Sequence, residues 1–179
     1  MGDFWTTTVN PAGYEKMVDP ISWYIEEELG ERESLNLVDI GSSNGRALSR
    51  LVDRLEQETG KEIYSVGLEP QSVIYDDMDE GNTDHLVKGK AGNSEELEIP
   101  LKSDSADIVA SNYILPFIGA EKQSAALREI EEVLKPEGVA SVHVDPNPSN
   151  EESVSSHWVL SSEDFQELGD DSSGFRDYP

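Results

Sequence analysis

The stretch Leu37-Val38-Asp39-Ile40-Gly41-Ser42-Ser43-Asn44-Gly45 is an apolar run that ends in an acid and continues as a loop of small residues. The run predicts a strand buried on both faces, as in a parallel sheet. Glycines in the loop can adopt positive φ, and its small polar residues can cap a following helix. Apolar residues recur at helical spacing from Ala47, and Gly60 ends the pattern. The loop is therefore expected to present free N–H groups to a nucleotide-like ligand.

The spacing of the loop disfavours two common nucleotide motifs. The dinucleotide fingerprint needs glycine at its first, third and sixth positions, but the third and sixth are Ser43 and Arg46 here. The phosphate loop ends in Gly-Lys-Ser/Thr, which does not occur in the chain. NAD binding and ATP binding through these loops are therefore disfavoured.

The loop resembles motif I of the class I S-adenosylmethionine-dependent methyltransferases, in which an acid precedes three glycines at alternate positions. Asp39, Gly41 and Gly45 match that pattern, and Ser43 replaces the middle glycine. The resemblance implies that the loop binds the methyl donor. The residues it predicts at the cofactor site are Asp39, Gly41, Ser42, Ser43, Asn44 and Gly45.

A second predicted strand, Ile63 to Glu69, also ends in an acid and is followed by Pro70. In nucleotide-binding α/β units, an acid about 20 residues beyond the glycine loop accepts hydrogen bonds from the ribose. Glu69 resembles this ribose acid of the methyltransferases, and Pro70 stands where the family packs against adenine. An exposed surface glutamate is the alternative interpretation.

A third short strand is expected within Asp84–Gly89. In the methyltransferases, a Gly-Asp-Ala-like turn after this strand binds the adenine amine. Asn93, followed by Ser94, resembles that turn, because an amide oxygen can also accept a hydrogen bond. Gly89-Lys90-Ala91 is an alternative alignment, which places a lysine where an acceptor is needed.

Two later stretches resemble the group that includes the ubiquinone and menaquinone methyltransferases. Residues 105–115 resemble its Ser-Phe-Asp strand and exit, and Leu134-Lys135-Pro136-Glu137-Gly138 resembles its Leu-Lys-Pro-Gly-Gly turn. Between them, Glu121 to Leu134 predicts an amphipathic helix, which Pro136 ends, and a fifth strand is expected to begin after Gly138. The landmarks follow the family order from residue 37 to residue 144.

The resemblance also indicates where the chemistry takes place. Asn112 is expected to contact the donor, and Asn112 and Tyr113 are the catalytic candidates at the exit of the fourth strand. His143, with Asp145, is a weaker candidate for a general base.

The predicted fold class is α/β, a Rossmann-like and mostly parallel sheet with helices on both faces. Residues 1–179 form one methyltransferase-like domain, with an N-terminal helical cap (1–34), an S-adenosylmethionine-binding core (35–145) and a short acidic C-terminal segment (146–179). In the cap, Asp19 and Pro20 predict the start of a helix. The family's N-terminal helix helps to form the acceptor pocket, which implies that Tyr14, Lys16 and Trp23 line it.

The C-terminal segment is short for the family's final strands. Strands six and seven are expected to be abbreviated or missing, with one extra strand within Val154–Leu160 and a short helix over Leu160–Leu168. An exposed sheet edge favours homodimerisation.

Composition limits the remaining possibilities. The chain of 179 residues contains no cysteine and only three histidines, so it predicts no disulfide and no metal site. It shows neither a signal peptide nor a membrane-spanning run, which favours a cytoplasmic protein.

Charge bears on the partners. The 38 acids and 13 bases give a formal net charge of −25, spread along the chain, which indicates a salt-adapted surface as in a halophilic organism or its virus. Nucleic acid is disfavoured as the acceptor because no basic patch is evident, so a small-molecule or lipid-like acceptor is preferred. The alternatives are a noncatalytic methyltransferase-like binding or scaffold protein and an acidic interaction module.

Overall fold

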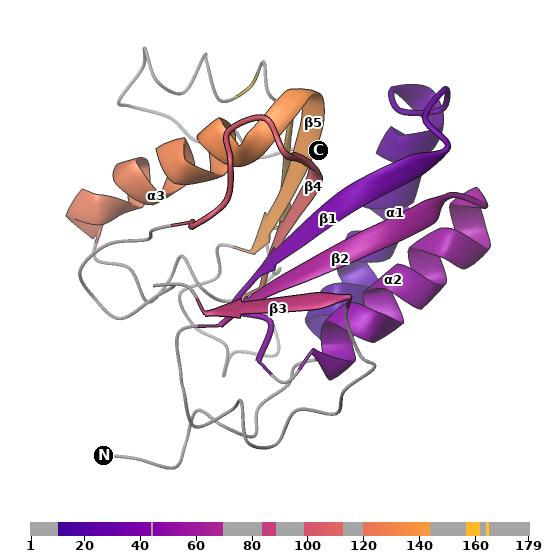
Figure 1. The fold of residues 1–179 in the computed structure, drawn as a ribbon, viewed down its shortest axis with the longest axis horizontal. Coiled ribbons are helices and arrows are strands. Elements are labelled where there is room, and N and C mark those ends of the chain that lie inside the picture. The colour runs from indigo at the N-terminus through magenta and orange to yellow at the C-terminus, as the bar shows by residue number, and fades with distance from the viewer. Residues whose placement is uncertain are drawn as a thin grey trace.

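The computed structural model describes residues 11–43, 45–69, 84–88, 99–112, 120–143, 157–161 and 164 (Figure 1). Three helices and six strands are present in this part of the chain. They are α1 (Pro11–Glu27), β1 (Ser34–Ile40), α2 (Arg46–Thr59), β2 (Glu62–Glu69), β3 (His85–Lys88), β4 (Ala106–Ser111), α3 (Ala120–Val133), β5 (Leu134–His143) and β6 (His157–Ser161).

The strands form one sheet in the order β3-β2-β1-β4-β5-β6. Strand β6 is antiparallel to β5, and every other neighbouring pair is parallel. The chain builds the sheet outward from β1 to β3 and then crosses to β4 on the other side of β1. The strand order therefore reverses between β1 and β4, where open α/β sheets bind ligands at the carboxyl ends of their strands.

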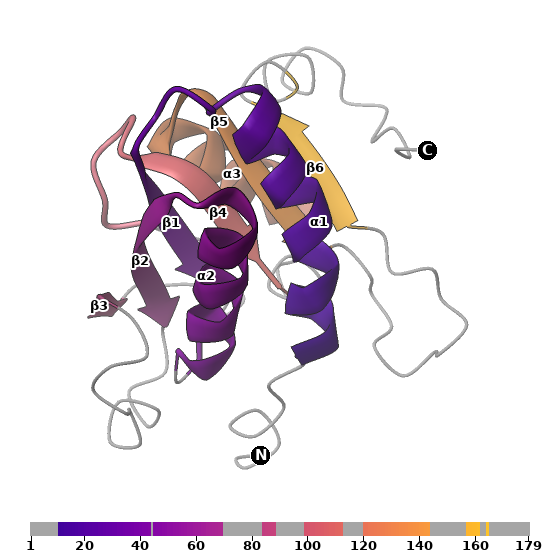
Figure 2. The ribbon, with the colours of Figure 1, turned by 90° about the vertical axis from the view of Figure 1, so that its right-hand side faces the viewer.

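Helices cover both faces of the sheet, as predicted. Helices α1 and α2 lie side by side over one face, and α3 lies over the other (Figure 2). Leu35 and Leu37 of β1 pack into the core beneath α1 and α2, whereas Val38 and Ile40 pack into the core beneath α3. The two-sided burial expected of this strand is confirmed, and so is the mostly parallel α/β fold.

Helix α1 begins earlier than the sequence predicts. It starts at Pro11, and Pro20 lies inside it instead of at its first turn. An internal proline costs a helix about 3 kcal/mol. The preceding turns place Tyr14, Met17 and Val18 in the core, where each fully buried apolar side chain stabilises by about 1.5–3 kcal/mol. This burial offsets the proline, and it could not be read from the local sequence.

Helix α2 ends as predicted but starts differently. Gly60 adopts φ 68° and donates its N–H to Glu56 O, which confirms the expected stop. At the other end the N-cap is Gly45, at φ 78°, and no side chain caps the helix. The prediction that Ser42 or Ser43 caps the first turn is therefore wrong, and Asn44 lies outside the described residues.

Strand β5 begins at Leu134, directly after α3, and not beyond Gly138 as predicted. Leu134 pairs with Ala106, but the next pair is Val139 with Ile108, so the residues between them bulge out of the ladder. A Cβ at Gly138 would lie 2.8 Å from Lys135 O, so the bulge requires glycine there. The stretch predicted as a turn between two elements is thus a bulge within a strand.

Strand β6 confirms the extra strand expected within Val154–Leu160. After it, only Asp164 is described, so the rest of the predicted helix over Leu160–Leu168 and any further strand lie outside the described residues. In the described part of the chain, no helix is long and apolar enough to cross a membrane.

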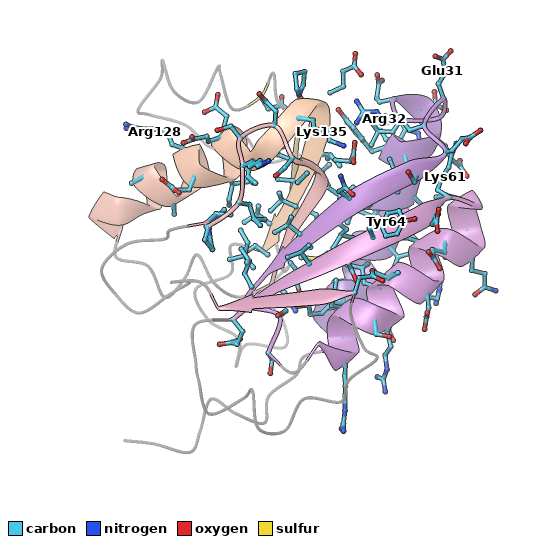
Figure 3. All side chains as sticks on the ribbon, viewed as in Figure 1. Glu31, Arg32, Lys61, Tyr64, Arg128 and Lys135 are labelled. Carbon is cyan, nitrogen blue, oxygen red and sulfur yellow. The ribbon has the colours of Figure 1, made fainter. Side chains whose placement is uncertain are left out.

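The carboxylate of Asp107, which is fully buried on β4, joins three segments where the strands begin. Its Oδ1 accepts from Arg32 Nη1 in the loop after α1, and its Oδ2 accepts from Lys135 Nζ of β5 and from the backbone N–H of Asn36 of β1, both at 2.7 Å. Figure 3 shows Arg32 and Lys135 at this end of the sheet. Asp107 lies in the stretch 105–115, and Lys135 lies in the Leu134–Gly138 turn motif. The two late sequence landmarks are therefore joined by an ion pair between these residues.

We expect Asp107→Asn to destabilise the fold by about 3 kcal/mol, because it removes the buried charge while its cationic partners remain. Urea unfolding in molar KCl measures this change. Asp104→Asn is the matched control, because Asp104 is exposed and adopts φ 55°, which asparagine tolerates well. Equal stability of the two variants would contradict a central role for the Asp107 contacts.

Candidate functional site

The glycine loop after β1 is fastened to the end of β2. Gly41 N–H and Ser42 N–H both donate to Leu68 O, at 2.8 and 3.1 Å. Gly41 adopts φ 82° and Gly45 adopts φ 78°, conformations that favour glycine. The loop therefore turns sharply at the carboxyl ends of β1 and β2, beside the point where the strand order reverses.

Ser43 of this loop contacts Glu69, the last residue of β2. Ser43 adopts φ 53°, the left-handed region in which the family's glycine is free of strain, and its N–H donates to Glu69 Oε2 at 2.9 Å. Glu69 is buried at the end of β2. The backbone thus accommodates serine at this position, and the predicted ribose acid lies against the loop instead of on the protein surface.

Asp39 is the buried acid of the loop motif, with none of its surface exposed. Tyr14 of α1 donates its hydroxyl to Asp39 Oδ2 at 2.7 Å. Burial raises the pKa of Asp39 to about 7, the Tyr14 hydrogen bond opposes this rise, and the charge of Glu69 adds to it. The carboxyl group is therefore poised to change its protonation state near neutral pH.

Several buried polar atoms near this edge have no hydrogen-bond partner among the described residues. Asp39 Oδ1 and Ser42 Oγ lie at the end of β1, and Ser111 Oγ lies at the end of β4, in register with Ile40. Leaving such atoms unsatisfied costs about 1–3 kcal/mol each, so native proteins usually pair them with protein, water or ligand. Their position at the carboxyl ends of β1 and β4 makes this edge the candidate binding site.

The other predicted site residues are described in part or not at all. Asn112 is buried directly after β4, next to Ser111, as expected of a residue facing this edge. His143 ends β5, but its side chain is not described. The remaining predicted residues lie outside the described ranges: Asn44, Pro70, Asn93, Ser94, Tyr113 and Asp145.

The cap contributes differently from the prediction. Trp23 is 60% exposed, so it does not line an enclosed pocket. Tyr14 donates its hydroxyl to Asp39, the acid of the loop motif, a contact that the sequence did not indicate. Ser111 was also missed, although its place beside Asn112 at the exit of a buried strand was the available signal.

A hollow of about 260 Å³ lies between α1 and α2. Its walls combine apolar residues with charged ones of both signs, namely Tyr14, Glu15, Val18, Ala47, Arg50, Leu51, Asp53 and Arg54. Tyr14 lines this hollow, and its hydroxyl donates to Asp39. Within the described ranges, no cluster of three or more histidines or acids could hold a metal ion.

The reversed strand order, the glycine loop and the acid at the end of β2 define a Rossmann-like α/β protein with a candidate ligand site at the carboxyl edge of its sheet. Residues 38–142, more than half of the chain, match the family described as a methyltransferase domain. The chain therefore belongs to this methyltransferase family. Membership supports S-adenosylmethionine as the cofactor.

Solved structures share the fold. A candidate sarcosine dimethylglycine methyltransferase from Galdieria sulphuraria has a TM-score of 0.53 at 21% identity, covering 72% of this chain and 45% of that protein. A candidate methyltransferase of an antibiotic biosynthesis pathway from Anabaena variabilis has a TM-score of 0.50 at 17% identity, covering 69% of this chain and 44% of that protein. The chain thus spans about half the length of these two proteins. No curated protein matches it.

We expect Asp39→Asn to raise the stability of the ligand-free protein, relative to the wild type, more at pH 8 than at pH 4. The folded-state pKa of Asp39 lies above its ordinary value of 3.8, so the folded state holds the proton longer and loses stability as pH rises from about 4 to about 7. A rise of about three pKa units corresponds to roughly 4 kcal/mol, an upper bound for the gain. Urea unfolding of both proteins across this range measures the difference, and parallel stability curves would contradict it.

We expect Ser43→Gly to change the free energy of unfolding by less than about 1 kcal/mol. The relief of the left-handed conformation is offset by the greater freedom of glycine in the unfolded chain. Ser43→Val should destabilise by about 1–3 kcal/mol, because a β-branched residue is strained at this φ. Ser43→Asn is the polar control that tolerates the conformation, and thermal unfolding ranks the three variants. Valine tolerated as well as asparagine would show that the loop does not need this backbone shape.

Proposed function

We propose that this chain binds S-adenosylmethionine at the carboxyl edge of β1, β2 and β4 and transfers its methyl group to a small-molecule or lipid-like acceptor. The observation that carries the proposal is the convergence of three features at one edge of the sheet. They are the glycine loop, Glu69 and the Asp39 oxygen that has no hydrogen-bond partner in the described part of the chain. Family membership supports the donor and the methyl-transfer chemistry.

The residues of this edge suit the parts of the donor. Glu69 lies where a carboxylate can accept from the ribose hydroxyls, as an acid at the end of the second strand does in related folds. The turn at Gly41 lets the ligand approach the backbone closely, because glycine has no Cβ. Asp39 Oδ1 can accept a hydrogen bond from the donor's ammonium group.

The donor supplies a methyl group already activated by the sulfonium. The protein's work is therefore to hold both reactants in line, to exclude water and, for a weakly acidic acceptor, to take up a proton. We assign contact with the donor or acceptor to Asn112, which is buried at the exit of β4. Tyr113 stays a catalytic candidate beside Asn112, and His143 stays the weaker candidate for a general base.

The acceptor class follows from charge. The net charge of −25 disfavours a polyanion such as nucleic acid, whose binding depends on lysine and arginine. A salt-adapted surface, a cytoplasmic location and homodimerisation through a sheet edge complete the proposal. The surface charge makes molar KCl the appropriate medium for every binding experiment, because it screens the repulsion between the acids.

We expect S-adenosylmethionine to bind the wild-type protein in calorimetric titrations, and Glu69→Gln to weaken binding about 10- to 100-fold. The loss of hydrogen bonds to a charged group accounts for that range. Gly41→Val should abolish binding, because the loop would have to leave φ 82°. Glu62→Gln is the matched control, since Glu62 is an exposed glutamate at the other end of β2.

Each result has a distinct meaning. A folded wild-type protein that does not bind the donor would overturn the proposed function. Full affinity in both Glu69→Gln and Gly41→Val would show that the donor binds elsewhere. Donor binding without methyl transfer to any acceptor in a panel of small molecules and lipids would favour the noncatalytic, methyltransferase-like alternative.

A further inference from the structure

The contact between Tyr14 and Asp39 joins two parts of the molecule that are 25 residues apart in sequence. Tyr14 lies in the first half of α1, and Asp39 lies near the end of β1, two residues before the first glycine of the loop. Both side chains are buried, and the oxygen atoms are 2.7 Å apart. Helix α1 is therefore tied directly to the strand that carries the proposed donor loop.

The geometry of the carboxyl group leaves its two oxygens in different states. Oδ2 accepts from the Tyr14 hydroxyl, whereas Oδ1 is buried and has no partner among the described residues. A carboxylate whose one oxygen is fixed cannot rotate freely, so its second oxygen points in a defined direction. A buried and oriented acceptor of this kind is ready for a hydrogen-bond donor on a ligand.

The groups around Asp39 show why this hydrogen bond matters. Tyr14 faces it from α1, and Glu69 is the other ionisable group that acts on it, from β2. Its neighbours in register are uncharged, namely Gly67 on β2 and Ala110 on β4, and Ser141 follows Ala110 on β5. Among these groups, the Tyr14 hydroxyl alone favours the ionised carboxylate, because burial and Glu69 oppose it.

Two kinds of contact hold the Tyr14 side chain. Tyr14 is only 7% exposed and packs in the core beneath α1 and α2, although it also lines the hollow between these helices. Its hydroxyl contact to Asp39 adds a directional tie between this part of α1 and β1. The hydrogen bond between Tyr14 and Asp39 therefore couples the position of this part of α1 to the orientation of the Asp39 carboxylate.

We propose that Tyr14 is a positioning residue of the donor site, whose hydroxyl holds the Asp39 carboxylate ionised and oriented so that Oδ1 receives the ammonium group of S-adenosylmethionine. This role rests on the proposed function. It requires that donor binding depend on the ionised form of Asp39 and that Tyr14 set the pH at which that form becomes available.

The test compares S-adenosylmethionine affinity from pH 5.5 to pH 9 in molar KCl for the wild type, Tyr14→Phe and Asp39→Asn. We expect wild-type affinity to rise with pH and to level off above about pH 7, the pKa of Asp39. Loss of the hydroxyl raises that pKa further, so the midpoint for Tyr14→Phe should move up by about one pH unit. Its affinity should then be about tenfold weaker at pH 6 and within threefold of the wild type at pH 9. Asp39→Asn should bind weakly, without this pH dependence.

Tyr24→Phe is the matched control. Tyr24 is a second buried tyrosine of α1, and its hydroxyl donates to Glu137 O at 3.3 Å, at the end of the sheet opposite the loop. Removing this hydroxyl changes the packing of the same helix without touching Asp39, so the pH midpoint should stay at the wild-type value. A second measurement without ligand follows the Asp39 carboxyl carbon by NMR, where Tyr14→Phe should shift the titration upward and Tyr24→Phe should not.

The outcomes separate this role from the proposed function. Wild-type protein that binds no S-adenosylmethionine overturns both. Wild-type binding with a uniform loss of affinity in Tyr14→Phe, at an unchanged midpoint, overturns the positioning role alone, because it shows that Tyr14 only supports packing. An unchanged carboxyl titration in ligand-free Tyr14→Phe also overturns it.

Discussion

The buried carboxylate of Asp107 fixes where three segments of the sheet begin. Both of its oxygens are satisfied, by Arg32, Lys135 and the Asn36 N–H. This contact fixes the register of β4 relative to β1 and β5. The positions of the carboxyl ends of these strands relative to one another follow from that register. The glycine loop and Asn112 are held in place from the far end of the sheet, because a strand held at its start can hardly slide along its neighbours.

The sheet therefore carries two buried aspartates with opposite surroundings. Asp107 is compensated by cations at the edge where the strands begin. Asp39 lies at the opposite edge with Glu69 nearby, and one of its oxygens has no hydrogen-bond partner among the described residues. Compensation at the first edge supports stability, and the lack of it at the second is the usual mark of a functional site. We propose that this second edge binds S-adenosylmethionine, the cofactor that membership in the methyltransferase family supports.

The sequence predicted the sheet well because buried parallel strands are short apolar runs, and β1, β2 and β4 each show one. Local patterns failed where tertiary contacts decided the outcome. Because Tyr14 and Met17 are buried, α1 begins well before Pro20, which lies inside the helix. Because Leu134 pairs with Ala106, it belongs to β5 and not to the preceding helix. In the site, the loop and Glu69 were predicted from spacing, whereas the Tyr14 contact was not, because no pattern links residues on separate elements.

The proposed role of Asp39 links donor binding to the release of protons. Because burial raises the pKa of Asp39 to about 7, part of the empty sites carry a proton at neutral pH, and a ligand that binds only the carboxylate displaces it. Part of the heat of binding then belongs to the buffer that receives the proton, and it changes with the buffer's ionisation enthalpy. By the same linkage, the proposed role implies that occupancy of the site falls as the surroundings become more acidic at constant donor concentration.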